Sequence, residues 1–460
     1  MALGEKQTPQ AEFWIATQSL AKAPGHPFYR WLNGLLAEQK FDVWIEEQCR
    51  KFYSDEGRPG IPPGVYFRML LIGYFENLDS ERGIAWRCQD SLSLRDFLGY
   101  SLDKDTPDHS SLSRIRQRID LETHQEVFAF ALKILAANDL VKGKTAGIDA
   151  TTLEANAALR SIVRRDTGEK YQEFLTRLAK ESGIETPTRE DLQKLDRKRP
   201  HKGSNDDWKN PHDPDAKITK MKDGRTHLAH KAEHAVDMDT GAILGVTLQG
   251  ADLGDTTTVI ETFNEAAANM EALQQEPEVK DKIHPDWLSE AVLDKGYHSN
   301  ETLVTLDEHE VRTYISEPDR GRRDWEDKEQ EQKAVYGNRR RIRGKRGRRL
   351  MRKRGELVER TFAHCYETGA MRRTHLRGHE NILKRLLFHV CGFNLSLILR
   401  KLTGCGTPKE LADKLGSLIF AIFAVIRVCG ARYYKLEPKT PLISVHALNG
   451  HMLGKYVEVN

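Results

Sequence analysis

The sequence predicts a mixed α/β fold that is preceded by an all-helical N-terminal domain. Apolar residues recur at helical spacing through most of residues 12–140. From Lys144 onward the pattern changes to short runs of residues that favour strands, and helical patterns return after about residue 355. Strands followed by helices around an interrupted sheet are typical of α/β and α+β architectures.

The composition indicates a soluble protein with room for two or three domains. The 460 residues carry a net charge of only +3, from 71 basic and 68 acidic residues. Six scattered cysteines without a C-x-x-C pair argue against a disulfide scaffold or zinc finger, and no signal pattern opens the chain. The apolar run 415–426 is shorter than the roughly 20 residues that a membrane helix needs. We therefore expect a cytoplasmic protein in which this run is a buried helix or a protein interface.

Two helices stand out in the N-terminal part. In "IPPGVYFRMLLIGYF", two prolines precede an apolar run, as at many helix starts. In "TPDHSSLSRIRQRI", Leu112, Ile115 and Ile119 form one apolar face. Arg114 and Arg118 lie four residues apart on another face, where they could contact DNA.

Five strands are predicted after this helical part. The first lies in "AGIDATTLEAN", the second and third flank a turn at Asp239–Gly241, and the last two lie in "EAVLDKGY" and "VRTYISE". A hydrophilic interval, about 157–225, separates the first two strands. It contains two short helical patterns and a loop rich in turn formers.

Three acidic residues are candidate metal ligands. Asp149 lies within the first strand, Asp294 follows the fourth, and Glu359 lies in a late helix. If the fold brings them together, their charges would raise one another's pKa unless a cation neutralises them. Mg²⁺ and Mn²⁺ prefer such oxygen ligands. Taken singly, each acid is more often a turn former or a helix cap, so spacing alone is a weak signal.

A basic run covers residues 338–354, just before the helix that we expect to start near Gly355. Eleven of its 17 residues are basic and none is acidic, so the run cannot be a packed core. We expect it to contact DNA phosphates, the alternative being a solvated segment. The basic residues are Arg339, Arg340, Arg341, Arg343, Lys345, Arg346, Arg348, Arg349, Arg352, Lys353 and Arg354.

Two other kinds of site are not supported. His227, His230 and His234 have a spacing that could suggest zinc, but on a strand His227 and His230 face opposite sides. The sequence contains no G-x-S-x-G motif, so a serine hydrolase is not supported.

Several long strings resemble the bacterial insertion-sequence transposases of the DDE class. They include "GIDATTLEANAALRSIVRRDTGE", "LDKGYHSN" and "VERTFAHCYETGAMRRTHLRG", and "GRPGIPPGVYFRMLLIGYF" resembles the N-terminal helical domain of these proteins. The resemblance runs from about residue 20 to 402. It implies a ribonuclease H-like core, with a central mixed sheet flanked by helices, over residues 141–402. Residues 1–140 would be the helical DNA-binding domain, 157–225 an insertion, and 403–460 a tail of unclear role.

The resemblance also implies the roles of the site residues. Asp149, Asp294 and Glu359 would be the catalytic metal ligands, holding Mg²⁺ or Mn²⁺ as two ions, with Glu356 as a rival for the third position. Many relatives place Arg four residues before that Glu and Lys seven after it, where this chain has Gly355 and Tyr366. Arg354 and Arg360 are the alternatives for phosphate contact.

The function implied is a DNA transposase that cuts the ends of its own element and joins them to target DNA. Its partners would be the terminal inverted repeats and the target, bound by a dimer or higher oligomer in the bacterial cytoplasm. Two alternatives remain open: a catalytically inactive or repurposed DNA-binding protein, and a ribonuclease H-like nuclease without strand transfer.

Overall fold

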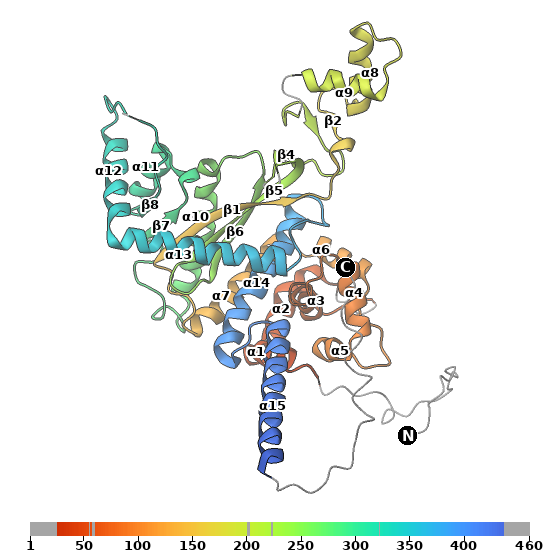
Figure 1. The fold of residues 1–460 in the computed structure, drawn as a ribbon, viewed down its shortest axis with the longest axis vertical. Coiled ribbons are helices and arrows are strands. Elements are labelled where there is room, and N and C mark those ends of the chain that lie inside the picture. Colours follow the sequence, from red (N-terminus) through yellow and green to blue (C-terminus); the bar gives the residue numbers. More distant parts are fainter. Residues whose placement is uncertain are drawn as a thin grey trace. The chain divides into compact units, whose positions relative to one another are not determined.

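The computed structural model describes residues 25–436, except 55, 58, 59, 200–202, 222, 223 and 322. The chain divides after Pro408 into two compact units (Figure 1). The first unit holds the helical part, the sheet and the insertion. In the second, the structure describes the continuation of a single helix, α15 (Pro408–Leu436).

The predicted N-terminal helices are present. Their elements are α1 (Pro27–Glu38), α2 (Phe41–Cys49), η2 (Arg50–Phe52), α3 (Pro63–Phe75), α4 (Glu81–Asp90), α5 (Leu92–Leu98), α6 (His109–Arg118) and α7 (Leu121–Ala137). Every residue of α3 is buried, which explains its largely apolar sequence, and the one charged residue, Arg68, binds Asp42. Asp108 caps α6 by accepting a hydrogen bond from the Ser111 amide at 2.7 Å.

All five predicted strands form, in one six-stranded mixed sheet. Its members are β1 (Thr145–Glu154), β4 (Lys217–Lys220), β5 (Thr226–Asp237), β6 (Ile243–Gly250), β7 (Glu290–Leu293) and β8 (Arg312–Ile315). The order is β5-β1-β7-β8, with β4 and β6 both paired to the outer edge of β5. Strands β1, β7 and β8 are parallel, whereas β5 is antiparallel to β1.

Helices cover both faces of this sheet. On one face, α10 (Asp255–Gln275) approaches so closely that a Cβ at Gly245 would lie 2.8 Å from the Ala266 nitrogen. On the other face, α13 (Lys345–Phe362) packs against β1, and a Cβ at Gly147 would lie 3.2 Å from Val358. Helix α14 (His379–Thr403) packs against α3, α7 and β6, and so joins the helical part to the sheet.

The insertion between β1 and β5 has a small core of its own. Its elements are η3 (Leu159–Ser161), β2 (Val163–Arg164), α8 (Tyr171–Glu181), α9 (Arg189–Lys198) and β3 (Trp208–Lys209). Trp208 is buried in that core, and a capping box joins Thr188 and Asp191. Figure 1 shows α8, α9 and β2 grouped beyond the β4–β5 end of the sheet.

The remaining elements correct one prediction. They are η4 (Lys295–Tyr297), α11 (Asn300–Glu308), α12 (Glu329–Arg343) and η5 (Ala363–Thr368), a single turn of π-helix that follows α13. The helix expected to start near Gly355 begins earlier, because α12 and α13 run through the basic run with a break at Gly344. Arginine and lysine are good helix formers, so the charge did not prevent a helix.

In the apolar run near the C-terminus, two of the described side chains are exposed within the structure. Phe420 and Phe423 in α15 are 76% and 66% exposed, which does not support the buried-helix interpretation and leaves the interface interpretation untested. By length and composition, one described helical stretch, His379–Phe423, could cross a membrane. Since 89% of its most apolar window is buried inside the protein, it has the character of a core helix.

Candidate active site

The sheet brings two of the three predicted acids together. In the parallel pair β1–β7, Ile148 lies opposite Leu293, so that Asp149 and Asp294 follow at adjacent positions. Strand β7 ends at this point, and Asp294 becomes the first residue of the turn that leads into η4. The carboxyl ends of parallel strands are a common place for binding sites.

A guanidinium joins the two aspartates. Arg354 on α13 donates a hydrogen bond from Nη1 to Asp149 Oδ2 at 2.7 Å, and its Nη2 lies 3.7 Å from Asp294 Oδ1. Burial raises the pKa of Asp149, while the Arg354 charge and the Ala150 amide act in the opposite direction. The Arg354 guanidinium therefore offsets part of the cost of burying the Asp149 carboxylate.

Both candidates for the predicted third acid lie on α13, and the helical phase distinguishes them. Lys353 and Leu357 lie on the flank toward the β5–β6 hairpin, where they contact Asp239 and Gly241. Glu359 is about 200° around the helix from Leu357, at 3.6 residues per turn. It therefore lies on the flank of α13 that faces away from the hairpin, about 100° around the helix from Val358, which packs against β1.

Glu356 has a different environment. It is about 200° around the helix from Arg354, away from the sheet, and its Oε1 accepts a hydrogen bond from Arg360 at 2.7 Å. Both glutamates are exposed. The helical phase therefore favours Glu359 over Glu356 as the third acid.

A buried network supports the turn that carries Asp294. Tyr297 of η4 donates a hydrogen bond to Glu233 Oε1 at 2.8 Å, on the α10 face of the sheet. Glu233 also accepts from Thr258 and Thr262 of α10. Because Glu233 is fully buried, burial raises its pKa, and these three donors stabilise its charge.

A second contact fixes α13 against β5. His234 lies opposite Asp149 in the sheet, and it contacts Thr361 at 2.9 Å and Tyr366 at 2.6 Å. Tyr366 is fully buried, so this residue, which replaces the expected Lys, cannot contact DNA. It lies in the π-helical turn η5, a feature that is frequent at functional sites.

The residues fit a divalent cation. Two carboxylates already share one positively charged group, and oxygen ligands are those that Mg²⁺ and Mn²⁺ prefer. Within the described residues, no group of three or more His, Cys, Asp or Glu side chains is arranged to hold a metal ion. Glu359 would therefore have to approach when an ion binds.

The basic run divides into internal and external residues. Four arginines bind groups of the protein: Arg339 binds Glu317, Arg341 the Thr313 carbonyl, Arg346 Glu290, and Arg354 the aspartates. Lys353 lies 3.7 Å from Asp239. The others are exposed: Arg340, Arg343, Lys345, Arg348, Arg349 and Arg352.

Arg372 is a site residue that the sequence did not single out. It donates from Nη1 to Thr151 Oγ1 at 3.2 Å, on the same face of β1 as Asp149 and two residues further along. The signal was present, because Arg372 lies in the string "GAMRRTHLRG". Arg372 lies near Asp149 because the segment after α13 folds back onto β1. The spacing of residues along the sequence does not reveal that contact.

The histidines are structural. His230 and Asp213 are both buried, with His230 Nε2 3.2 Å from Asp213 Oδ2, and His227 lies 3.8 Å from Glu154. These contacts agree with the argument against zinc.

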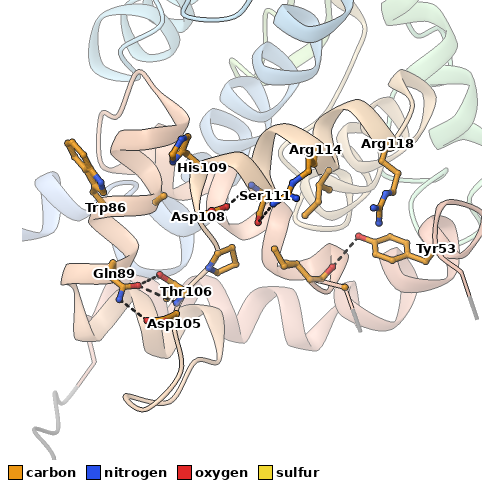
Figure 2. Close-up of a pocket in the computed structure, with 15 residues that line it drawn as sticks. Tyr53, Trp86, Gln89, Asp105, Thr106, Asp108, His109, Ser111, Arg114 and Arg118 are labelled. Atoms are coloured by element: carbon orange, nitrogen blue, oxygen red, sulfur yellow. Dashed lines mark hydrogen bonds between the residues drawn. The ribbon is translucent and has the colours of Figure 1, made fainter. Parts of the chain in front are cut away.

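The predicted DNA-contacting arginines of α6 line a pocket of about 830 Å³ in the helical part (Figure 2). Arg118 lies 5.3 Å from the centre of the Tyr53 ring. Arg114 contacts Ser110 and Ser111 at the start of the same helix. Trp86, 67% exposed, lies at the opposite end of the pocket in Figure 2. Exposed arginines beside aromatic rings are common at nucleic-acid surfaces.

The sheet order, the helices on both faces and the paired aspartates define a ribonuclease H-like protein. Residues 165–395, half of the chain, match the family described as "Transposase DDE domain", and residues 20–118 match "Transposase domain (DUF772)". The chain belongs to the DDE transposase family, which confirms the resemblance seen in its sequence. The DDE match includes Asp294 and Glu359 but begins after Asp149. No curated protein and no solved structure matches the chain.

Proposed function

We propose that this protein is a DNA transposase that cuts the ends of its own insertion sequence and joins them to target DNA. The observation that supports this most strongly is the pair Asp149 and Asp294 at adjacent strand positions, bridged by a cationic side chain. The DDE family match gives the pair its chemical context. We expect the protein to act in the bacterial cytoplasm, on the nucleoid.

The carboxylates would hold divalent ions, Mg²⁺ or Mn²⁺ and two in number. Asp149 and Asp294 would be shared ligands, and Glu359 would complete the set. Such ions supply activation of the attacking hydroxyl and stabilisation of the leaving oxygen in phosphoryl transfer. The protein contributes position: the β1–β7 register fixes one aspartate beside the other, and the Tyr297–Glu233 bond holds the turn after Asp294.

Two phosphoryl transfers would take place at this site. Water first attacks the phosphodiester at the element end, so that the bond to the 3′ oxygen breaks and a 3′ hydroxyl is released. That hydroxyl then attacks a target phosphate, and the target's own 3′ oxygen leaves. No covalent bond between protein and DNA is needed in either step.

The DNA-binding surfaces are assigned in two parts. The helical domain, residues 1–140, would bind the terminal inverted repeats through Arg114 and Arg118. The exposed basic residues of α12 and α13, within the catalytic domain 141–402, would hold the DNA backbone. Joining two ends to one target requires at least a dimer in the DNA complex. We assign no role to residues 403–460.

Carboxylate substitutions test the proposal. Asp149→Asn, Asp294→Asn and Glu359→Gln should each reduce metal-dependent cleavage of a labelled element end, and strand transfer, by at least about 1,000-fold, because each removes a charge from the metal site. Transposon-end binding should persist in a gel-shift assay, since the helical domain would supply it.

Glu356→Gln is the matched control for Glu359→Gln. It lies on the same helix and is equally exposed, so it should retain cleavage within about threefold. Wild-type cleavage by Asp149→Asn would refute the proposal. Cleavage without any strand-transfer product in the wild type would instead support a nuclease.

A further inference from the structure

Arg354 occupies the position between the two aspartates that a divalent cation would need. Its Nη1 is 2.7 Å from Asp149 Oδ2, and its Nη2 is 3.7 Å from Asp294 Oδ1. A magnesium ion bound to the same oxygens would lie about 2.0–2.1 Å from them. The guanidinium and an ion bound to these same two oxygens would overlap, so they cannot bind there at once.

The backbone of Arg354 is fixed, so only its side chain can give way. On either side of it along α13, Leu350 and Val358 are buried, and Val358 packs against the Gly147 position of β1. Residue 354 is therefore held beside the site whether or not its guanidinium is bound to the aspartates.

The guanidinium is incompletely satisfied where it lies. It is 12% exposed, and its Nε is buried without a hydrogen-bond partner among the described residues. An arginine can donate five hydrogen bonds in a fork that suits carboxylates and phosphates equally. Arg354 uses one short hydrogen bond and one longer ion pair here, which leaves donors for another anion.

We propose that Arg354 is a resident counter-cation of the aspartate pair that a divalent ion displaces, and that the released guanidinium then binds a DNA phosphate. This inference rests on the proposed function, because it assumes that the aspartates bind metal and that DNA enters the same site. Metal ion and DNA then bind cooperatively, since each stabilises the arrangement that the other requires. Such coupling is reciprocal by thermodynamic necessity.

The first test measures metal binding without DNA. The full-length protein is titrated with Mn²⁺, and free Mn²⁺ is followed by electron paramagnetic resonance. Arg354→Gln should bind Mn²⁺ about tenfold more tightly than the wild type, because its competitor is gone. Arg189→Gln, a change at an exposed arginine of α9, should leave the affinity unchanged. An unchanged or weakened affinity in Arg354→Gln would overturn the inference, since a residue that only orients the aspartates would give that result.

A lysine substitution covers the case in which Arg354→Gln does not fold. Arg354→Lys keeps the charge, but it replaces the fork by a single ammonium that cannot span both carboxylates equally well. Its Mn²⁺ affinity should lie between those of the wild type and Arg354→Gln. An affinity equal to or below that of the wild type, in a folded protein, would count against displacement.

The second test measures the coupling to DNA. A fluorescent random-sequence duplex is titrated with protein, in EDTA or in Mn²⁺ at matched ionic strength, and its anisotropy is recorded. Mn²⁺ should strengthen duplex binding several-fold more in the wild type than in Arg354→Gln. Equal strengthening in both proteins would show that the released guanidinium does not reach DNA.

Asp149→Asn distinguishes failure of this inference from failure of the proposed function. If Asp149→Asn binds as many Mn²⁺ ions as the wild type, the aspartates are not metal ligands and both proposals fail. If Asp149→Asn binds fewer ions but Arg354→Gln does not bind Mn²⁺ more tightly, only the counter-cation role fails.

Discussion

At the scale of single residues, the site depends on charged side chains that are partly buried, and burial disfavours their charged forms. Asp149 lies on a central strand, where burial alone raises its pKa, and Arg354 supplies the nearest compensating charge. Its neighbour across the sheet, His234, is fully buried and contacts two hydroxyl groups of α13 and η5. One side chain thus ties β5 to the helix that carries Glu359.

His234 should make the protein sensitive to acid. Burial lowers its pKa from the usual 6.5 to about 3, so the folded state favours the neutral ring. This contribution to stability is complete above about pH 6.5, and it is lost as the pH falls from there toward 3. Within that window, each pH unit costs about 1.4 kcal/mol of the free energy of unfolding.

The measurement is urea unfolding between pH 4.5 and 6.5. His234→Gln should reduce the slope of unfolding free energy against pH by about 1.4 kcal/mol per unit, because one proton fewer is taken up on unfolding. His109→Gln, at an exposed position, should leave the slope unchanged. Identical slopes in the wild type and His234→Gln would mean that the ring is already charged in the folded protein.

At the scale of elements, α12 and α13 show why composition identified a basic segment but not its contacts. Eleven charges in 17 residues predict a surface, yet Arg339 and Arg346 bind Glu317 and Glu290, carboxylates 22 and 56 residues away. Those pairings arise only when β7 and β8 lie under the helices. The sequence could therefore predict that the segment meets solvent, but not which arginines face inward.

The sequence also predicted the acidic residues of the site without predicting that two of them are adjacent. The strands that carry Asp149 and Asp294 were recognisable from their residues, and the hairpin at Asp239–Gly241 from its turn. That the two acids are adjacent follows from the parallel β1–β7 register, which local sequence does not encode. The family resemblance supplied this topology, and the structure then added Arg354 and Arg372.

The salt dependence of DNA binding can test whether the exposed residues of the basic segment contact DNA while the inward-facing arginines do not. Replacing Lys345, Arg348 and Arg349 by Gln should weaken binding to every duplex alike, because these exposed residues would contact phosphates. The slope of log K against log salt should fall by about 0.9 for each phosphate that the variant no longer neutralises. Fluorescence anisotropy at several salt concentrations measures both quantities.

Arg339→Gln is the control for this experiment. Its guanidinium lies 2.8 Å from Glu317 and lowers the pKa of that carboxyl, so its loss should reduce stability and leave the salt slope unchanged. If the triple variant keeps the wild-type slope, the exposed face of α13 is a solvated surface without DNA contacts.

At the scale of the whole molecule, the helical part and the segment that follows α13 meet at a second pocket of about 560 Å³. Its lining is of mixed charge and includes Asp79, Arg82, Arg373 and His375. It shares His109 with the pocket beside α6. Arg373 also pairs with Glu154 at the end of β1. The two pockets thus adjoin at His109, and a residue that lines the second pairs with the end of β1.

This arrangement predicts that end recognition and chemistry can be separated. Replacing Arg114 and Arg118 by Gln should weaken binding to a duplex that carries the element's terminal inverted repeat by at least about tenfold, because these exposed side chains would face the DNA at the α6 pocket. Binding to a random duplex of the same length should change by less than about twofold, since the backbone contacts on α13 remain.

Cleavage should fall with end binding and recover at high protein concentration, because the aspartate site is intact. The carboxylate variants should show the reverse, with normal end binding and no recovery at any concentration. Equal weakening on both duplexes would mean that α6 contacts only the DNA backbone, and that recognition of the ends lies elsewhere in the chain.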